Sequence, residues 1–154
     1  MRISLDMADW SLGLSLIVLT TVVHTLGVVM LTLAGFKLRS WLENRGLRLR
    51  EAVLIVIGVI GAVGLMLAVL HGTEYAIWAL AYLWVGALDT PMHAMLYSID
   101  SMTTRGASGL VLPSQWQLMG ALEAADGMIL FGISTAFIFA VMQAFWPLLM
   151  VQRR

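Results

Sequence analysis

The sequence has no cysteine and few charged residues. The absence of cysteine excludes disulfides, thiolate nucleophiles and cysteine-based metal sites. Charged residues make up 12% of the chain, against roughly 25% in an average soluble domain. So few charges cannot cover a surface that faces water. The 9 basic and 9 acidic residues also cancel, which argues against a nucleic acid as partner.

Long hydrophobic stretches fill most of the chain, which is 60% hydrophobic. Three of them, at residues 12–36, 52–70 or beyond, and 118–145, are long enough to cross a hydrocarbon core of about 30 Å as helices. We therefore expect an all-α integral membrane protein with three transmembrane helices. No nucleotide-binding glycine loop, nucleophile elbow or metalloprotease motif is present. The chain is not expected to be an enzyme or to need a cofactor or a structural metal.

Basic residues indicate the orientation in the lipid bilayer. The connector at residues 37–51 carries five of them, namely Lys37, Arg39, Arg45, Arg48 and Arg50. Positively charged loops stay on the cytoplasmic side, so we expect this linker and the Arg153-Arg154 end to be cytoplasmic. The N-terminus, with Asp6 and Asp9, is then outside. Within the linker we expect a short amphipathic segment that lies on the inner membrane surface.

A polar hairpin at residues 89–109 separates the second and third hydrophobic stretches. Thr90 suits an N-cap and Pro91 the first turn of a helix, which predicts a helix over residues 91–102 that is too short to span. The following Thr-Thr-Arg-Gly-Ala-Ser-Gly, residues 103–109, has no helical character. Such backbone is tolerated at membrane depth only inside protein or beside a water-filled cavity. A re-entrant helix followed by extended backbone is how a pore loop presents carbonyls to an ion.

This arrangement resembles the pore domain of potassium channels and, more narrowly, small bacterial channels of the two-pore-domain-like potassium channel family. Matching motifs run from residue 71 to the C-terminus, and they include His71, Glu74, Trp78-Ala79, Tyr82, Gly86-Ala87, Leu96-Tyr97-Ser98, Thr103-Thr104, Leu112-Pro113, Trp116, Gly120–Ala124, Phe131-Gly132 and Ser134–Phe137. The resemblance implies a homotetramer in a bacterial inner membrane, with monovalent cations as the permeant ions.

Hydropathy, charge and the resemblance together divide the chain. An N-terminal transmembrane helix (1–36) and the basic linker (37–51) precede a pore domain (52–154). That domain would contain an outer helix (52–88), a pore helix (91–102), a filter (103–109) and an inner helix (118–146).

The filter departs from the family pattern Thr-Thr-Leu/Val-Gly-Tyr-Gly-Asp. The expected filter residues here are Thr103, Thr104, Arg105, Gly106, Ala107, Ser108 and Gly109. Arg105 replaces an apolar residue, Ala107 the bracing tyrosine and Ser108 a glycine. These changes predict a cation channel with altered or relaxed selectivity. There are two alternatives. The first is a non-conducting pore-loop protein, which could be a regulatory subunit that co-assembles with a related channel. The second is a lipid- or ion-binding membrane module.

Arg105 has three possible positions. An ion pair with Asp100 would brace the filter against the pore helix, because an isolated charge is costly to bury and a paired one much less so. Otherwise the guanidinium reaches outer water, or faces the lumen and repels cations. A charge reversal of both residues should restore assembly that either single reversal destroys, if the ion pair is correct.

Four other ionisable residues form pairs at helical spacing. His71 and Glu74 share a face of the outer helix, as an ion, proton or divalent-cation site near its outer end or as a hydrogen-bonded packing pair. Glu123 and Asp126, at the outer end of the inner helix, attract cations to the mouth or hydrogen-bond the loop after the filter. His24 is expected to form a hydrogen bond between helices. Gly127 and Gly132 allow either bending or close helix packing.

Overall fold

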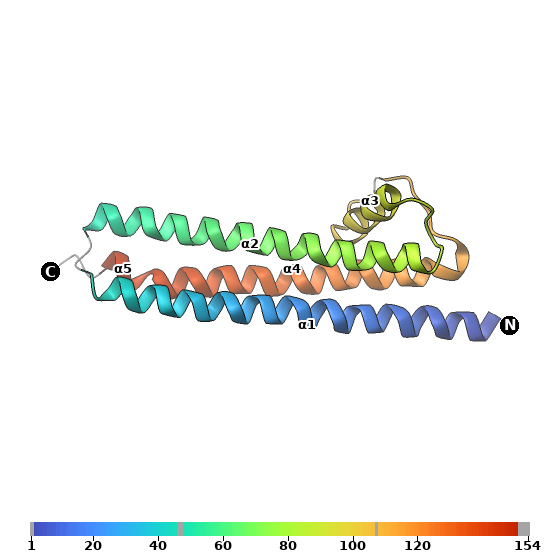
Figure 1. Cartoon of the computed structure of the whole chain (residues 1–154), viewed down its shortest axis with the longest axis horizontal. Helices are drawn as coiled ribbons and strands as arrows, with labels where there is room; N and C mark the ends of the chain where they lie inside the picture. The colour runs from blue at the N-terminus through green and yellow to red at the C-terminus, as the bar shows by residue number, and fades with distance from the viewer. Residues whose placement is uncertain (1, 46–47, 107, 151–154) are drawn as a thin grey trace. The chain divides into compact units, whose positions relative to one another are not determined.

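The structure, a computed structural model, describes residues 2–45, 48–106 and 108–150, and for residues 2–8 the backbone alone. Figure 1 shows an all-helical chain, with no strand among the described residues. Its elements are α1 (Arg2–Glu43), α2 (Leu49–Trp84), α3 (Pro91–Met102), the 3₁₀ helix η1 (Ser114–Trp116), α4 (Gln117–Phe145) and α5 (Pro147–Met150). Ala107 and the basic C-terminal end at residues 152–154 lie outside the described residues.

Three segments are long and apolar enough to cross a membrane by length and composition: Asp9–Glu43, Leu49–Trp84 and Ser114–Met150. Large apolar side chains such as Val18, Leu54 and Leu65 are exposed along them. Such a surface is unfavourable in water and suits lipid. The prediction of an all-helical, multi-pass membrane protein is confirmed at this level.

The helix ends differ from the ranges expected from hydropathy. Helix α1 continues to Glu43 and α2 begins at Leu49, so most of the expected linker is helix and residues 37–43 form the last turns of α1. No separate surface helix exists among the described linker residues, while residues 46 and 47 lie outside them. At the other end, α2 stops at Trp84 because Gly86 adopts φ +68° and the amide of Ala87 bonds to the carbonyl of Tyr82 at 2.9 Å. This is the left-handed glycine stop of a helix C-terminus.

The chain forms two compact units, each containing parts of the long helices. The first unit comprises residues 1–24 and 71–131, and the second comprises residues 25–70 and 132–154. The core of the first unit is built around Trp78, Tyr82, Met102, Met119 and Leu130.

The core of the second unit is smaller and gathers around Leu42, Val56 and Phe145. Here α1 approaches α2 closely at Gly27, where an added Cβ would lie 2.7 Å from Leu70 Cδ2. Small residues allow such close approach between membrane helices.

Candidate functional site

Helix α3 occupies Pro91–Met102, the range in which the sequence predicts a short helix. Thr90 caps its N-terminus by accepting a hydrogen bond from the His93 amide at 3.1 Å, and Pro91 stands in its first turn. Its 12 residues give a length of about 18 Å, against about 30 Å for the hydrocarbon core. The helix therefore cannot span a bilayer. Figure 1 shows α3 next to the C-terminal end of α2 within the first unit.

The segment after α3 turns its amides back toward that helix. The amides of Thr103, Thr104 and Arg105 donate to carbonyls of α3 at 2.9–3.0 Å. In a trans peptide the N–H and the C=O of the same unit point in opposite directions. Since each amide belongs to the peptide unit of the preceding carbonyl, the carbonyls of Met102, Thr103 and Thr104 point away from α3.

Left-handed backbone recurs in this segment. Thr104 has φ +54°, Gly106 φ +61° and Gly109 φ +70°. Glycine adopts this conformation readily, but a β-branched threonine does so at a cost of about 1–2 kcal/mol. Among the described residues, Thr104 is the only one other than glycine that has a positive φ. Strained backbone of this kind is characteristic of functional sites.

Asp100 connects the segment to α3 through both carboxylate oxygens. Arg105 Nε lies 2.5 Å from Oδ1, and the amide of Ser108 donates to Oδ2 at 2.8 Å. The hydrogen bond from Arg105, reinforced by that from Ser108, lowers the pKa of Asp100 to about 2. The Arg105 side chain is 57% exposed, whereas that of Asp100 is 5% exposed. The ion pair considered from the sequence is thus present in the structure, with an arginine that also remains in contact with solvent.

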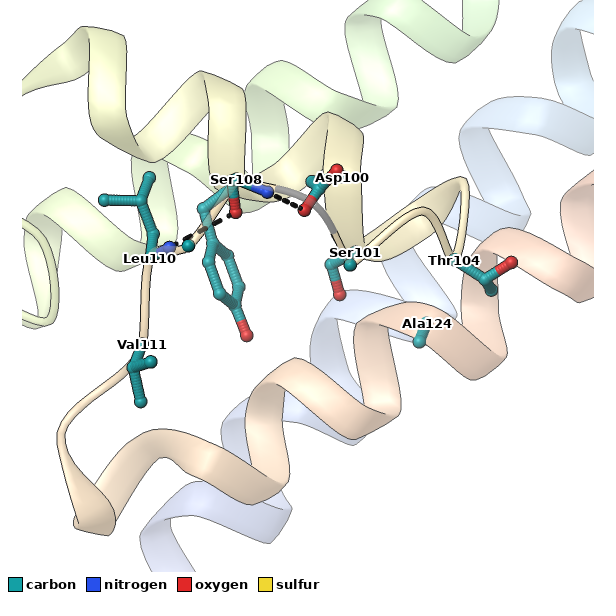
Figure 2. Close-up of a pocket in the computed structure, with 10 residues that line it drawn as sticks. Asp100, Ser101, Thr104, Ser108, Leu110, Val111 and Ala124 are labelled. Atoms are coloured by element: carbon teal, nitrogen blue, oxygen red, sulfur yellow. Dashed lines mark hydrogen bonds between the residues drawn. The ribbon is translucent and has the colours of Figure 1, made fainter.

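A cavity of about 400 Å³ lies between α3, the segment after it and α4. Figure 2 shows its lining, including Asp100 and Ser101 of α3, Ser108 of the loop and Ala124 of α4. The hydroxyl of Ser101 also donates to the Gly120 carbonyl at 3.0 Å, which joins α3 to α4. The expected filter segment is thus supported by α3, while its outer face has no covering element within the described chain.

Glu123 and Asp126 of α4 are buried, so neither faces water as expected for acids at a channel mouth. Glu123 accepts hydrogen bonds from the Tyr82 hydroxyl at 2.7 Å and the Ser98 hydroxyl at 2.5 Å. Asp126 accepts from the Thr20 hydroxyl at 2.6 Å and from Trp78 Nε1 at 3.0 Å. Among the described residues, their hydrogen bonds reach α1, α2 and α3 and do not reach the loop after the filter. The spacing of three residues identified the pair, but the partners of Glu123 and Asp126 lie far away in sequence.

The His71–Glu74 pair identified from the sequence belongs to a cluster of three residues in the structure, and His24 is the third. Glu74 Oε2 lies 2.9 Å from His71 Nδ1, one turn earlier on α2, and Glu74 Oε1 lies 2.7 Å from His24 Nδ1 on α1. All three side chains are buried. The sequence indicated a hydrogen-bonding role for His24 without a partner, because the partner is 50 residues away.

Comparison of the chain with protein-family models, with curated proteins and with solved structures finds no match.

Proposed function

We propose that this protein is a homotetrameric pore-loop cation channel with altered or relaxed selectivity. Four copies would place the segment after α3 around a common axis, and partly dehydrated monovalent cations would meet its carbonyl oxygens. In this arrangement α2 is the outer helix, α3 the pore helix and α4 the inner helix.

The direction of the carbonyls after α3 carries this proposal. Cation-selective filters bind ions through rings of backbone carbonyls that replace the hydration shell. Here the amides of Thr103, Thr104 and Arg105 are bonded to α3, so the carbonyls of Thr103 and Thr104 are directed outward. No hydrogen bond to the Thr104, Arg105 or Gly106 carbonyls is found within the described residues. Carbonyls without hydrogen-bond partners, in a non-helical segment that follows a helix too short to span, suit an ion path better than a packed interior.

The exposure of the segment supports an assembly. Thr103, Thr104, Arg105 and Gly106 are exposed in the single chain. Non-helical backbone in a membrane must be buried in protein or line water. Copies of the same chain arranged around one axis would satisfy that requirement, and closed cyclic symmetry is the usual form of homo-oligomers.

Flux through sealed vesicles tests the proposal. The purified protein is reconstituted, and the reversal potential is measured under potassium, sodium, calcium and chloride gradients. We expect a cation current that Gly106→Ala strongly reduces, because alanine is strained at φ +61°. Gly61→Ala is the matched control, since an added Cβ at Gly61 meets nothing within 4 Å. The absence of cation flux under every gradient would refute conduction by the homotetramer.

Arg105 favours one alternative, a non-conducting pore-loop protein or a regulatory subunit of a related channel. Its charge is 57% exposed, and four such charges near a narrow path would repel cations. Arg105→Leu distinguishes the two functions. In a conducting channel the variant changes selectivity, whereas in a blocked one it creates a current that the wild-type protein lacks.

A further inference from the structure

A buried cluster of two histidines and one glutamate joins α1 to α2 in the first unit. His24 comes from α1, and His71 and Glu74 come from successive turns of α2. Candidate ligand atoms of the three side chains all lie within 4.8 Å of one another. We propose that His24, His71 and Glu74 form a binding site for a divalent transition-metal ion of the zinc class. All three belong to one chain, so the proposal does not depend on channel activity or on a tetramer.

The spacing of the atoms suits coordination. Two ligands that are each about 2.1 Å from a metal are about 3.0 Å apart at a right angle and about 3.4 Å apart at a tetrahedral angle. The two contacts between Nδ1 and carboxylate oxygen measure 2.7 and 2.9 Å. The candidate atoms lie within 4.8 Å of one another, so a tetrahedral separation of about 3.4 Å requires them to approach by at most about 1.4 Å.

The surrounding charge favours a cation. Asp126 of α4 interacts electrostatically with Glu74 and His24. Its Oδ1 is buried and has no hydrogen-bond partner in the described residues. The one arginine described within the first unit from residue 9 onward, Arg105, is paired with Asp100. Among the described residues, two carboxylates thus share a buried region with two histidines and without a lysine or arginine beside them, and a buried charge without a cationic partner is costly.

The ligand set indicates the class of metal. Two imidazole nitrogens and one carboxylate suit Zn²⁺, Co²⁺ or Ni²⁺, whereas Ca²⁺ and Mg²⁺ prefer sites made entirely of oxygen. Three protein ligands also leave a fourth position for water or for a further carboxylate. An ion bound there would connect the first helix to the second.

Cobalt binding to the whole protein in detergent tests the site. The protein is prepared without a histidine tag and is stripped with a chelator. Titration with Co²⁺ is followed by its visible absorption, and Zn²⁺ is then added in competition. We expect one ion per chain, displacement of Co²⁺ by Zn²⁺, and a rise of the unfolding temperature with Zn²⁺.

Single substitutions locate the ion. His24→Gln and Glu74→Gln should each weaken binding by at least about 100-fold, since loss of supporting groups alone costs about 10–100-fold. His93→Gln is the matched control, because His93 is exposed on α3 and is the third histidine of the chain. It should leave the affinity unchanged.

Three results would overturn the proposal. They are a wild-type protein without Co²⁺ absorption or a Zn²⁺-dependent shift in unfolding temperature, binding that survives in His24→Gln, and binding that is lost in His93→Gln. If a variant at His24 or Glu74 fails to fold, the Co²⁺ absorption and the Zn²⁺-dependent unfolding temperature of the wild-type protein decide whether the site exists. None of these readouts measures ion flux, so failure of the metal site and failure of the channel remain distinguishable.

Discussion

Replacement of Gly127 by alanine should push α3 away from α4. A Cβ added at Gly127 would overlap the carbonyl oxygen of Met102 and lie 2.7 Å from its Cα. These atoms belong to the backbone at the end of α3, so no side-chain rotation can relieve the overlap. The helix end that precedes the proposed filter would have to move.

The magnitude follows from two opposing effects. Overpacking of a tight core costs typically about 1–3 kcal/mol, and a backbone neighbour places this site toward the upper part of that range. Alanine also gains about 1 kcal/mol over glycine from helix propensity. The net destabilisation should therefore be about 1–2 kcal/mol.

Gly132→Ala on the same helix isolates the steric effect. An added Cβ at Gly132 meets nothing within 4 Å, so this variant keeps the gain in propensity without the overlap. The two variants should differ by about 1–3 kcal/mol in their free energy of unfolding. A difference of 1 kcal/mol corresponds to about 2–4 °C in a chain of this size.

The assay is thermal unfolding in detergent, followed by circular dichroism, with both variants at the same protein and detergent concentrations. Gly127→Ala should unfold several degrees below Gly132→Ala. Equal unfolding temperatures, or a more stable Gly127→Ala, would show that α3 does not pack on α4 at this point. The assignment of Gly127 to close packing would then be wrong.

Three further predictions concern named contacts. Asp100→Ala should expose the Ser108 amide to hydrogen exchange more than Arg105→Gln does, because Asp100 accepts hydrogen bonds from both Arg105 and Ser108. Equal exchange in the two variants would contradict this. Because an arginine at position 100 could not accept the Ser108 bond, the double charge reversal of Asp100 and Arg105 should not restore full order. Since the pKa of Asp100 falls from its usual 3.8 to about 2, its contribution to stability is complete above about pH 4 and is lost as the pH falls through about 2; acid titration of Ser108 exchange should show this dependence, and Asp100→Asn should abolish it. Tyr82→Phe removes a donor to buried Glu123 and should lower the free energy of unfolding by about 1–3 kcal/mol, measured in the same thermal assay, whereas an unchanged unfolding temperature would argue against this bond.

Features determined by neighbouring residues were predictable from the sequence. The apolar stretches identified three helices of spanning length, and Thr90 and Pro91 identified the start of α3. Asp100 and Arg105 are five residues apart, close enough for a helix end and its following turn to bring them together. In each case the cause lies within one or two helical turns.

Features that depend on distant residues were not predictable. Glu74 and His24 are 50 residues apart, and Asp126 and Thr20 are 106 apart. Helical spacing showed which residues share a face, but it carries no information about the helix that the face contacts. The burial of Glu123 and Asp126 was missed for this reason. The end of α2 depends on the backbone conformation of Gly86, which hydropathy does not reveal.

The polar contacts of α1 have a consequence for biosynthesis. Asp9 accepts a hydrogen bond from the Met119 amide at 2.9 Å, and Thr20 donates to Asp126. Ribosomes add about 5–20 residues per second, so α1 emerges about 5–20 s before its partners on α4. During that interval Asp9 lacks the Met119 amide, whereas Thr20 can still donate to the Leu16 and Ile17 carbonyls of α1 itself. An acidic side chain is costly to place at membrane depth, so the nascent first helix should stay beside the insertion machinery until α4 has followed it into the bilayer.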